Sequence, residues 1–396
     1  MKPKLCLYFA TATLAVAISS LILLLPPNLN NYGRHLINYY YNKPAGDRDN
    51  TAGRRRIEFV PLDDGSVGPE SFAFGGGGVG PFTGVSGGRV VEWVEEERRW
   101  SEFAVTSPER YREGCDGLDP PQQEEMEHIC GRPLGLSFRE SNGDLYVADA
   151  YMGLLRVGPQ GGLADRMVTR VDGAPLVFTN GLDVDQSSDV VYFTDSSSRF
   201  QRRMHLLIVI TGDNTGRFMK YDPKTQQKTV LASNLMFPNG VALSHDGESI
   251  LVVETTNCRV LKYGLQNGEM EVFAELDGYP DNIKRSPTRG YWVGLYSKRT
   301  TLLKWLVSNP WIGKSLVKLV PLGVIKRVKS MFMGSGNVGL GVRLSESGEV
   351  VEVFNKGGDG GDDCSEEFGS ISEIMESDDG ELWVGSVESP FAARVH

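Results

Sequence analysis

Short apolar stretches separated by turn residues recur along most of the chain. From residue 61 onward, a turn leads into an apolar stretch, a second turn with Gly or Asp follows, and the next stretch carries aromatic and β-branched residues. Six copies of this pattern begin at Glu70, Gly135, Gly181, Gly240, Asn282 and Ile371. The turns of the last five copies contain NGD, SSD, HDG, TRG and DDG, which are typical of β-hairpins. We therefore expect six hairpins with an apolar first strand and an aromatic second strand.

Further hairpin patterns lie between these copies, for example over residues 216–232 and 258–275. Two hairpins per unit make a four-stranded sheet, and spacings of roughly 40–60 residues are typical of the blades of a propeller. The sequence therefore predicts an all-β chain that folds as a six-bladed β-propeller over residues 61–396. A pair of β-sandwiches is the alternative for many short strands, and we reject it because one pattern recurs across the whole chain.

The first 25 residues have a different character. Lys2 and Lys4 precede an uncharged apolar stretch from Leu5 to Leu25, which as a helix reaches roughly 30 Å and spans a bilayer. Signal-peptide cores are shorter, and PPNLNN follows in place of a clean cleavage site. We expect an uncleaved signal-anchor over residues 1–25, with a cleaved signal peptide as the alternative. Either one sends the chain into the secretory pathway, to the endoplasmic reticulum lumen or membrane first, with the vacuole and the cell exterior as alternatives.

Two further segments depart from the propeller pattern. Residues 26–60 are polar and aromatic, which indicates a stem between the membrane and the propeller. Residues 302–333 are apolar and basic and contain no Asp or Glu. This insertion predicts one or two amphipathic helices, broken near Pro310 and Pro321. We expect a lid over one end of the propeller, and contact with a membrane face is a compatible second role.

Cysteine usage and charge narrow the picture further. The secretory pathway permits disulfides, and two of the five cysteines, Cys115 and Cys130, flank a polar segment that we expect to be a loop. A Cys115–Cys130 disulfide would close this loop, and two free thiols are the alternative. No N-x-S/T sequence occurs, so N-glycosylation is not expected. The formal net charge of −10 argues against a nucleic-acid partner.

Polar residues stand directly before the first strands of several copies. They are Glu70, Asn180, Asn239 and the neighbouring pair Asp281 and Asn282. In a propeller, these positions converge on the central axis from different blades. Ca²⁺ accepts carboxylate and amide oxygens as ligands, whereas Zn²⁺ prefers His or Cys. The sequence therefore predicts an axial calcium site, and a simple turn-forming role is the alternative for each residue taken singly.

Long stretches of the chain resemble the plant strictosidine synthase-like proteins. The similar stretches are CGRPLGLSF, GLDVDQSSDVVYFTDSSSRFQRR, GRFMKYDPKTQQKTVLASNLMFPNGVALS and GYPDNIKRSPTRGYWVG, and the resemblance covers roughly residues 65–394. It implies a six-bladed propeller of secretory compartments, related to paraoxonase- and gluconolactonase-type hydrolases. The cysteine before GRPLGL matches the family's disulfide. A finer similarity points to the branch linked to formation of the pollen exine.

The resemblance to the hydrolases implies a role for the predicted calcium site. The same five positions resemble the catalytic calcium ligands of paraoxonase-type enzymes, in which the ion polarises a lactone or ester carbonyl and stabilises the oxyanion. Those enzymes carry a histidine at the position of Leu134, so the base that they use is missing there. The sequence places His205 and His245 in loops or turns, and we do not expect either to act as the base.

The resemblance to strictosidine synthase itself implies a different catalyst. That enzyme uses a Glu before the last strand pair as general base in a Pictet–Spengler condensation of tryptamine with secologanin. Glu373 falls on this position by its distance to the following DG-x-L-aromatic sequence, and a buried Glu with a raised pKa accepts protons well. Ile371 stands where the synthase has a histidine, so we do not expect that condensation. A place in an acid-rich segment without catalytic function is the alternative for Glu373.

The sequence thus predicts a protein that acts on a small organic molecule, hydrolase-like more than synthase-like, and leaves open whether it is catalytic. A calcium-dependent ester or lactone hydrolase is the first hypothesis. The alternatives are a non-enzymatic lumenal scaffold in biosynthesis or in exine and cell-wall formation, and a condensing enzyme that uses Glu373.

Overall fold

The structure is a computed structural model that describes residues 56–62, 65–320, 339–355 and 369–396. The predicted signal-anchor at 1–25, nearly all of the predicted stem at 26–60 and the last part of the predicted insertion lie outside the described residues. Within the described ranges, no helix is both long enough and apolar enough to cross a membrane.

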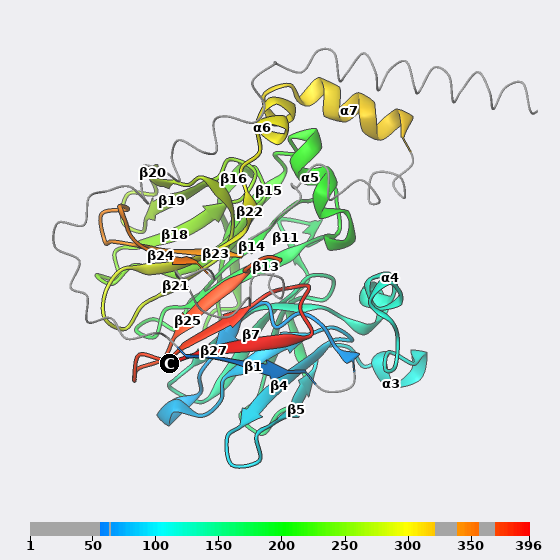
Figure 1. The fold of residues 1–396 in the computed structure, drawn as a ribbon, viewed down its shortest axis with the longest axis vertical. Helices are drawn as coiled ribbons and strands as arrows, with labels where there is room; N and C mark the ends of the chain where they lie inside the picture. The colour runs from blue at the N-terminus through cyan, green and yellow to red at the C-terminus, as the bar shows by residue number, and fades with distance from the viewer. Residues whose placement is uncertain (1–55, 63–64, 321–338, 356–368) are drawn as a thin grey trace, which may run out of the picture.

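Six antiparallel sheets form the blades of a six-bladed β-propeller, as the sequence predicts (Figure 1). The inner strands are β2 (Phe72–Ala73), β6 (Pro133–Arg139), β13 (Thr179–Val184), β17 (Pro238–Leu243), β21 (Gly278–Arg285) and β25 (Glu373–Glu376). The second strands are β3 (Phe82–Val85), β7 (Asp144–Asp149), β14 (Val191–Asp195), β18 (Ser249–Glu254), β22 (Tyr291–Lys298) and β26 (Leu382–Gly385). The third strands are β4 (Arg89–Val94), β8 (Gly153–Val157), β15 (Gly216–Asp222), β19 (Arg259–Gly264), β23 (Leu340–Leu344) and β27 (Phe391–Val395). The outer strands are β5 (Arg99–Val105), β10 (Asp165–Val168), β16 (Gln227–Leu235), β20 (Met270–Glu275), β24 (Val350–Asn355) and β1 (Ile57–Pro61).

Three short strands add to this framework. The strand β9 (Gly162–Leu163) pairs in parallel with β5 at the edge of the first blade. The strands β11 (Arg170–Val171) and β12 (Ala174–Pro175) pair with each other as a small separate hairpin.

The ring closes because the two ends of the described chain share one blade. The inner strands contact one another in chain order, and β25 contacts β2 to complete the circle. The strand β1 pairs with β27, with Ile57 opposite Val395, so the earliest described strand is the outer strand of the last blade. This pairing corrects the predicted boundary, because residues 57–61 belong to the propeller and not to the stem.

The core lies between neighbouring blades. In the described part of the chain, six apolar clusters each join one blade to the next. Single strands divide their side chains between two clusters: in β18, Ile250 and Val252 face the preceding blade, whereas Leu251 and Val253 face the following one. Alternate side chains of a strand point to opposite faces, so a strand buried on both faces must be apolar throughout. This is why the second strands are nearly continuous runs of apolar residues.

The inner strands carry β-bulges at the end that reaches the axis. The register shifts by one residue between Thr179 and Leu182, between Pro238 and Val241, and between Pro280 and Ile283. A bulge adds an unpaired residue and re-aims its side chain. Asn180, Asn239 and Asp281 lie in these bulges, so they are part of the inner strands and do not precede them as the sequence predicts.

Glycine follows the polar bulge residue because the inner strands nearly touch. A Cβ atom on Gly181 would lie 2.4 Å from the carbonyl oxygen of Asn239, and one on Gly240 would lie 2.6 Å from Cα of Asn282. Real Cβ contacts are not this short, so only glycine fits without moving the neighbouring backbone. In the two Asn–Gly pairs, Asn supplies a side chain at the axis and Gly supplies the room for the next blade.

Five helices lie outside the sheets in the described chain. They are α3 (Arg110–Glu113), α4 (Pro120–Cys130), α5 (His205–Thr211), α6 (Thr301–Ser308) and α7 (Pro310–Leu319), with short 3₁₀ turns η2 (Gly76–Gly78) and η3 (Arg202–Met204).

The helix α4 corrects the predicted loop between the two cysteines. Asp119 caps this helix by accepting from the backbone N–H of Gln122, whose side chain accepts from the N–H of Asp119 in return. Pro120 at the first helical position adds a second start signal. The predicted disulfide is confirmed, since Cys115 and Cys130 are bonded and fasten the C-terminal end of α4 to the preceding segment.

The helices α5, α6 and α7 pack together over one end of the propeller (Figure 1). Leu206, Ile208 and Ile210 of α5 share an apolar cluster with Leu303 and Leu306 of α6. The two helices of the predicted insertion thus form a lid together with α5, which comes from the third blade. The break between them lies at Pro310, and the one predicted at Pro321 is outside the described residues.

Candidate calcium site

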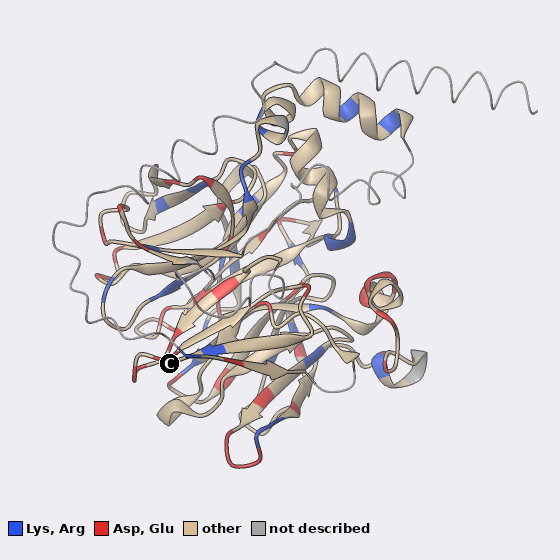
Figure 2. Ribbon diagram, in the orientation of Figure 1, with Lys and Arg blue, Asp and Glu red and all other residues tan. Residues whose placement is uncertain are grey.

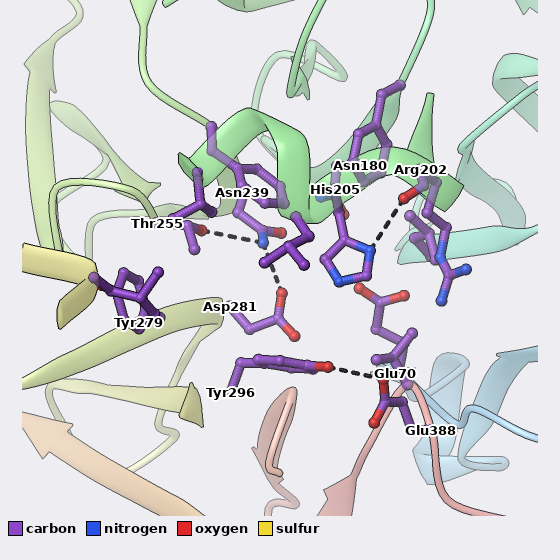
Figure 3. A pocket seen from close by; sticks show the side chains of 17 residues that line it. Glu70, Asn180, Arg202, His205, Asn239, Thr255, Tyr279, Asp281, Tyr296 and Glu388 are labelled. Carbon is purple, nitrogen blue, oxygen red and sulfur yellow. Dashed lines mark hydrogen bonds between the residues drawn. The ribbon is translucent and has the colours of Figure 1, made fainter. Parts of the chain in front are cut away.

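A cavity of about 80 Å³ lies beneath the lid at the axial end of the propeller. Four of the five predicted metal ligands line it: Glu70, Asn180, Asn239 and Asp281. They come from the first, third, fourth and fifth blades, and Figure 3 shows Glu70, Asn239 and Asp281 directed into a common space. The convergence expected from the repeat positions is therefore present for these four residues.

Three oxygens of this set have no hydrogen-bond partner although they are buried. They are Oε2 of Glu70, Oδ1 of Asn180 and Oδ1 of Asn239. A buried polar atom without a partner costs about 1–3 kcal/mol, so a folded protein tolerates three together only for a reason. Oxygens that share one cavity and lack donors are what an oxygen-liganded cation such as Ca²⁺ requires. The residues present therefore fit a calcium ion.

Neighbouring hydroxyl groups fix the direction of both amides. The Ser196 hydroxyl donates to the carbonyl oxygen of Pro238 (2.7 Å) and accepts from Nδ2 of Asn180 (3.0 Å). The Thr255 hydroxyl donates to the carbonyl of Pro280 (2.7 Å) and accepts from Nδ2 of Asn239 (3.3 Å). A hydroxyl has one hydrogen, and once it is donated the group can only accept. Each amide must therefore present its nitrogen to the hydroxyl and its oxygen away from it.

Of the three carboxyl groups that line the cavity, Glu70 and Asp281 have raised pKa values. Burial, with the charge of Asp281 as a second cause, raises the pKa of Glu70 to about 8. Burial raises the pKa of Asp281 to about 6, although the side chains of Ser372 and Asn239 (2.6 Å) donate to it and oppose the shift. Two buried carboxyls that resist ionisation together are stabilised by a cation that replaces their protons.

Asn282 is the predicted ligand that does not line the cavity. Its Nδ2 donates to the backbone carbonyl of Glu70 (3.4 Å), and its backbone N–H donates to the carbonyl of Ser372 (3.0 Å). Asn282 thus holds the segment that carries Glu70 and joins the fifth blade to the sixth, and its role as a ligand stays a prediction.

Glu373, the predicted catalytic residue, also lies outside the cavity lining. It is buried at the start of β25, where Oε1 accepts from the backbone N–H of Phe72 (2.6 Å). Its Oε2 lies 3.9 Å from Nζ of Lys284, which donates to the carbonyl of Leu136 (3.0 Å). Burial raises the pKa of Glu373 to about 7 and the Lys284 ammonium opposes this shift. The carboxyl therefore faces an internal ammonium group, and its catalytic role stays a prediction without support from its position.

The cavity also contains side chains that the sequence did not point to. His205 at the start of α5 lines the cavity, although the sequence places it in a loop. Its Nδ1 lies 3.2 Å from the carbonyl oxygen of Arg202, and a carbonyl only accepts, so Nδ1 carries the hydrogen. The neutral ring then has its basic lone pair on Nε2. Figure 3 shows the ring next to Glu70 and Asp281.

Arg202 also lines the cavity, and Glu127 of α4 holds its side chain. Its Nη1 lies 2.6 Å from Oε1 of Glu127, whose other oxygen accepts from the hydroxyl of Tyr151 (2.9 Å). Glu127 lies one turn before Cys130, so the disulfide fastens the end of α4 from which Arg202 is held. Through α4 and Glu127, the disulfide thus helps to fix Arg202, which forms part of one wall of the cavity.

The remaining walls are mostly apolar. Leu134, Phe178 and Phe237 line the propeller side, and Leu206, Val209 and Leu303 line the lid side. Opposite the lid, the hydroxyl of Tyr296 donates to Glu388 (2.8 Å) at the edge of the cavity (Figure 3). Within the described ranges, no three His, Cys, Asp or Glu residues are placed together to hold a metal ion, so a cation here depends on the amide oxygens.

Sequence comparisons connect the chain to a plant family. A sequence model described as strictosidine synthase matches residues 180–268. Protein STRICTOSIDINE SYNTHASE-LIKE 2 of Arabidopsis thaliana is 50% identical over 338 residues, which cover 83% of this chain and 86% of that protein. Protein STRICTOSIDINE SYNTHASE-LIKE 10 of the same plant is 47% identical over 330 residues, covering 83% and 84%. Adipocyte plasma membrane-associated protein of Salmo salar is 37% identical over 346 residues, covering 84% and 76%.

Solved structures share the propeller. A gluconolactonase from Xanthomonas campestris superposes with a TM-score of 0.53 at 15% sequence identity, covering 87% of this chain and 90% of that protein. Regucalcin from Agrobacterium tumefaciens, described as a calcium-binding protein, superposes with a TM-score of 0.52 at 11% identity, covering 85% and 90%. At these identities the similarity is one of fold alone.

Proposed function

Because the chain belongs to the strictosidine synthase-like family, we propose that it is a secretory-pathway enzyme that holds one Ca²⁺ ion and hydrolyses an ester or lactone of a small organic molecule. The observation that carries the proposal is the group of three buried oxygens without hydrogen-bond partners in one axial cavity. The shared fold with a gluconolactonase and with a calcium-binding regucalcin supports it. The Cys115–Cys130 disulfide supports the oxidising compartment.

The ion would be held by the four ligands that line the cavity, Glu70, Asn180, Asn239 and Asp281. When bound, Ca²⁺ supplies a Lewis acid that polarises the carbonyl of the substrate. Ser196 and Thr255 keep the two amide oxygens directed away from themselves, so the neutral ligands are oriented before any ion arrives. Such preorganisation lowers the cost of binding, because the ligands need not be reordered.

His205 is the residue best placed to move the proton in this reaction. With Nδ1–H donated to the Arg202 carbonyl, Nε2 accepts a proton from water while the water oxygen attacks the carbonyl carbon. The same nitrogen then returns the proton to the departing alkoxide, which balances the hydrolysis. His205 would thus replace the base that the resembling hydrolases carry at the position of Leu134.

The apolar walls indicate the kind of substrate. Phe178, Phe237 and Leu206 present hydrocarbon and aromatic surface to the cavity, and Leu303 of the lid covers it. These walls exclude bulk water and favour a hydrophobic acyl or alkyl group, while the polar groups at the axis hold the reacting carbonyl. We therefore expect aliphatic or aromatic esters and lactones to be better substrates than highly polar ones.

Leu134 favours a second candidate, a non-enzymatic lumenal scaffold in which the ion serves stability alone. This leucine lines the cavity where the resembling hydrolases have their histidine. The third hypothesis, a condensing enzyme, requires the carboxyl of Glu373 to reach a substrate, and its contacts with Phe72 and Lys284 direct it elsewhere.

A paired histidine experiment separates the enzyme from the scaffold. Turnover of a panel of aryl esters and lactones is measured with Ca²⁺ and with EDTA, together with the calcium-induced rise in melting temperature. We expect His205→Gln to lose turnover by at least about 100-fold, the usual contribution of a general base, and to keep the thermal shift. His245→Gln is the control, because its Nε2 lies by the carbonyl of Gly290 in a surface turn, outside the cavity lining. A wild-type chain that shows the thermal shift and hydrolyses nothing supports the scaffold.

A further inference from the structure

The outer face of the lid carries exposed apolar and basic side chains that have no role in the axial site. On α7, the side chains of Trp311, Lys314, Ser315, Lys318 and Leu319 are exposed. Positions 311, 314, 315 and 318 recur every three to four residues, so they share one side of the helix. Trp311 and Leu319 expose 67% and 73% of their surface, which is unusual for large apolar residues.

The opposite side of α7 is fixed to the body of the protein. Ile312 and Val317 pack against the apolar cluster beneath the lid, and Gly313 is buried. A Cβ on Gly313 would lie 1.5 Å from the carbonyl oxygen of Ile210, so α7 contacts the backbone of α5 directly. This close contact prevents α7 from rotating, and the face with Trp311 must point outward.

The charge of this face is opposite to that of the protein as a whole. The lid helices α6 and α7 carry three Lys and no Asp or Glu, whereas the chain has a net charge of −10. Figure 2 shows basic and no acidic residues along the ribbons of α6 and α7, at the edge of the molecule. Lys304 of α6 is exposed, as are Lys314 and Lys318 of α7.

We propose that the outer face of the lid, formed by Lys304, Trp311, Lys314, Lys318 and Leu319, docks on a lipid bilayer that contains anionic headgroups. Lysines attract anionic lipids, tryptophan is enriched at the level of the headgroups, and a leucine inserts into the acyl boundary. A nucleic-acid partner would leave the exposed tryptophan and leucine beside the charges unexplained.

This contact would bring the cavity to the bilayer surface. The inner side of the same lid contributes Leu206, Val209 and Leu303 to the cavity, so only the thickness of the lid separates the cavity from the docked membrane. Apolar esters partition into bilayers and would be concentrated beside the site. The docking itself rests on the outer face of the lid and does not depend on the ion or on the hydrolysis.

The test uses an environment-sensitive nitrobenzoxadiazole probe on the full chain. Ser315→Cys places the probe in the middle of the proposed face, and Glu96→Cys places it on the exposed turn between β4 and β5, at the other end of the molecule in Figure 1. Cys6→Ser and Cys364→Ser remove other reactive thiols, and Cys258 is buried. The full chain keeps its N-terminal segment in every sample, so that segment contributes equally to all variants.

Probe emission and quenching by dithionite are compared in vesicles of pure phosphatidylcholine and in vesicles with about 30% phosphatidylserine. We expect the probe at 315 to shift to the blue and to be protected only with phosphatidylserine, and the probe at 96 to respond to neither. Lys314→Glu with Lys318→Glu should lower the docked-to-free ratio by at least about fivefold per lysine. The experiment is run in EDTA, which keeps the axial site free of Ca²⁺ and adds no cation that binds phosphatidylserine; docking should persist, which separates this proposal from the proposed function.

Two results would overturn the proposal. One is a probe at 315 that responds like the probe at 96 in both kinds of vesicle. The other is protection that increases with protein concentration in the absence of lipid, which would identify the lid face as an interface between two copies of the chain.

Discussion

Replacing Asn180 by leucine separates the ligand role of its amide from any structural role. Leucine has the same branching of heavy atoms and is somewhat larger, so the change removes Oδ1 and Nδ2 without opening a cavity. In the structure, Oδ1 is buried without a partner, and the only bond that the amide donates goes to Ser196 (3.0 Å). The amide therefore contributes little to the stability of the ion-free protein, and it matters mainly when a cation is bound.

Asn180→Leu should change the stability of the ion-free protein and the stabilisation by calcium in opposite directions, and both changes can be estimated. Without calcium, Asn180→Leu loses one hydrogen bond worth about 1 kcal/mol and removes an unpaired buried oxygen that costs about 1–3 kcal/mol. The variant in EDTA should therefore be as stable as the wild type or more stable by about 1 kcal/mol. With Ca²⁺ at about 100 times its dissociation constant, the wild type gains about 2.7 kcal/mol, which at roughly 2 °C per kcal/mol is a rise of about 5 °C. The variant should lose most of this rise.

Thermal unfolding followed by circular dichroism, in EDTA and across a calcium titration, measures both effects. Asn267→Leu is the control, because this asparagine bonds only to Glu269 in an exposed turn of the fourth blade. It should leave the calcium-induced rise unchanged. An Asn180→Leu variant that is destabilised equally with and without calcium would refute the reasoning, since the amide would then be a structural element of the axis.

Three further predictions concern groups outside the ligand set. Because burial raises the pKa of Glu373 to about 7, the folded state holds a proton that the unfolded state releases above about pH 4.5, so this residue should lower stability between pH 5 and pH 7 by on the order of 3 kcal/mol. Urea unfolding of Glu373→Gln should show a pH slope that is smaller by this amount, while the contributions of Glu70 and Asp281, whose pKa values burial also raises, remain. Lys284→Met should cost about 1 kcal/mol through the pair at pH 7.5, because Glu373 with a pKa of about 7 then takes up a proton, and adding Glu373→Gln should recover that loss; a double-mutant cycle without coupling would contradict the ion pair. Replacing Cys115 and Cys130 by serine should cost about 3 kcal/mol of unfolding free energy, as expected for a loop of this length, and an unchanged urea midpoint would contradict a structural role for the disulfide.

The fold was predictable because one hairpin pattern is repeated and each repeat is complete in itself. The second strands are apolar throughout, as burial on both faces requires, and this marks them even in a single sequence. The strand β1 could not be assigned in the same way. The segment IEFVP has no hairpin partner beside it, and its partner β27 lies at the other end of the chain. Such a long-range pairing leaves no local pattern.

The polar residues that line the axial cavity were predictable because residues at equivalent places in a propeller meet at the axis. The adjacent pair Asp281 and Asn282 shows the limit of this argument. The pair lies in the β-bulge of β21, where the alternation of side chains is broken, so the sequence does not tell which of the two side chains enters the cavity. Asp281 lines it, and Asn282 turns to the backbone of Glu70.

His205 could not be placed from the sequence. It begins HLLIVIT, a short apolar run whose length fits a buried strand as well as a helix. The run forms α5, and only the packing of α5 against α6 and α7 carries the histidine over the axis. His205 therefore reaches the site only because α5 packs against helices that lie about a hundred residues later in the chain. No local sequence pattern indicates such a contact.

Equilibrium dialysis of the full chain against radioactive calcium tests the central claim most directly. The account predicts saturable binding of one ion per chain, in or below the range of about 10⁻⁴–10⁻³ M that is typical of extracellular calcium modules, and loss of that binding when Asn180 and Asn239 are both replaced by leucine. A folded chain that binds no calcium in this range, or a double variant that binds it as well as the wild type, would contradict the axial site.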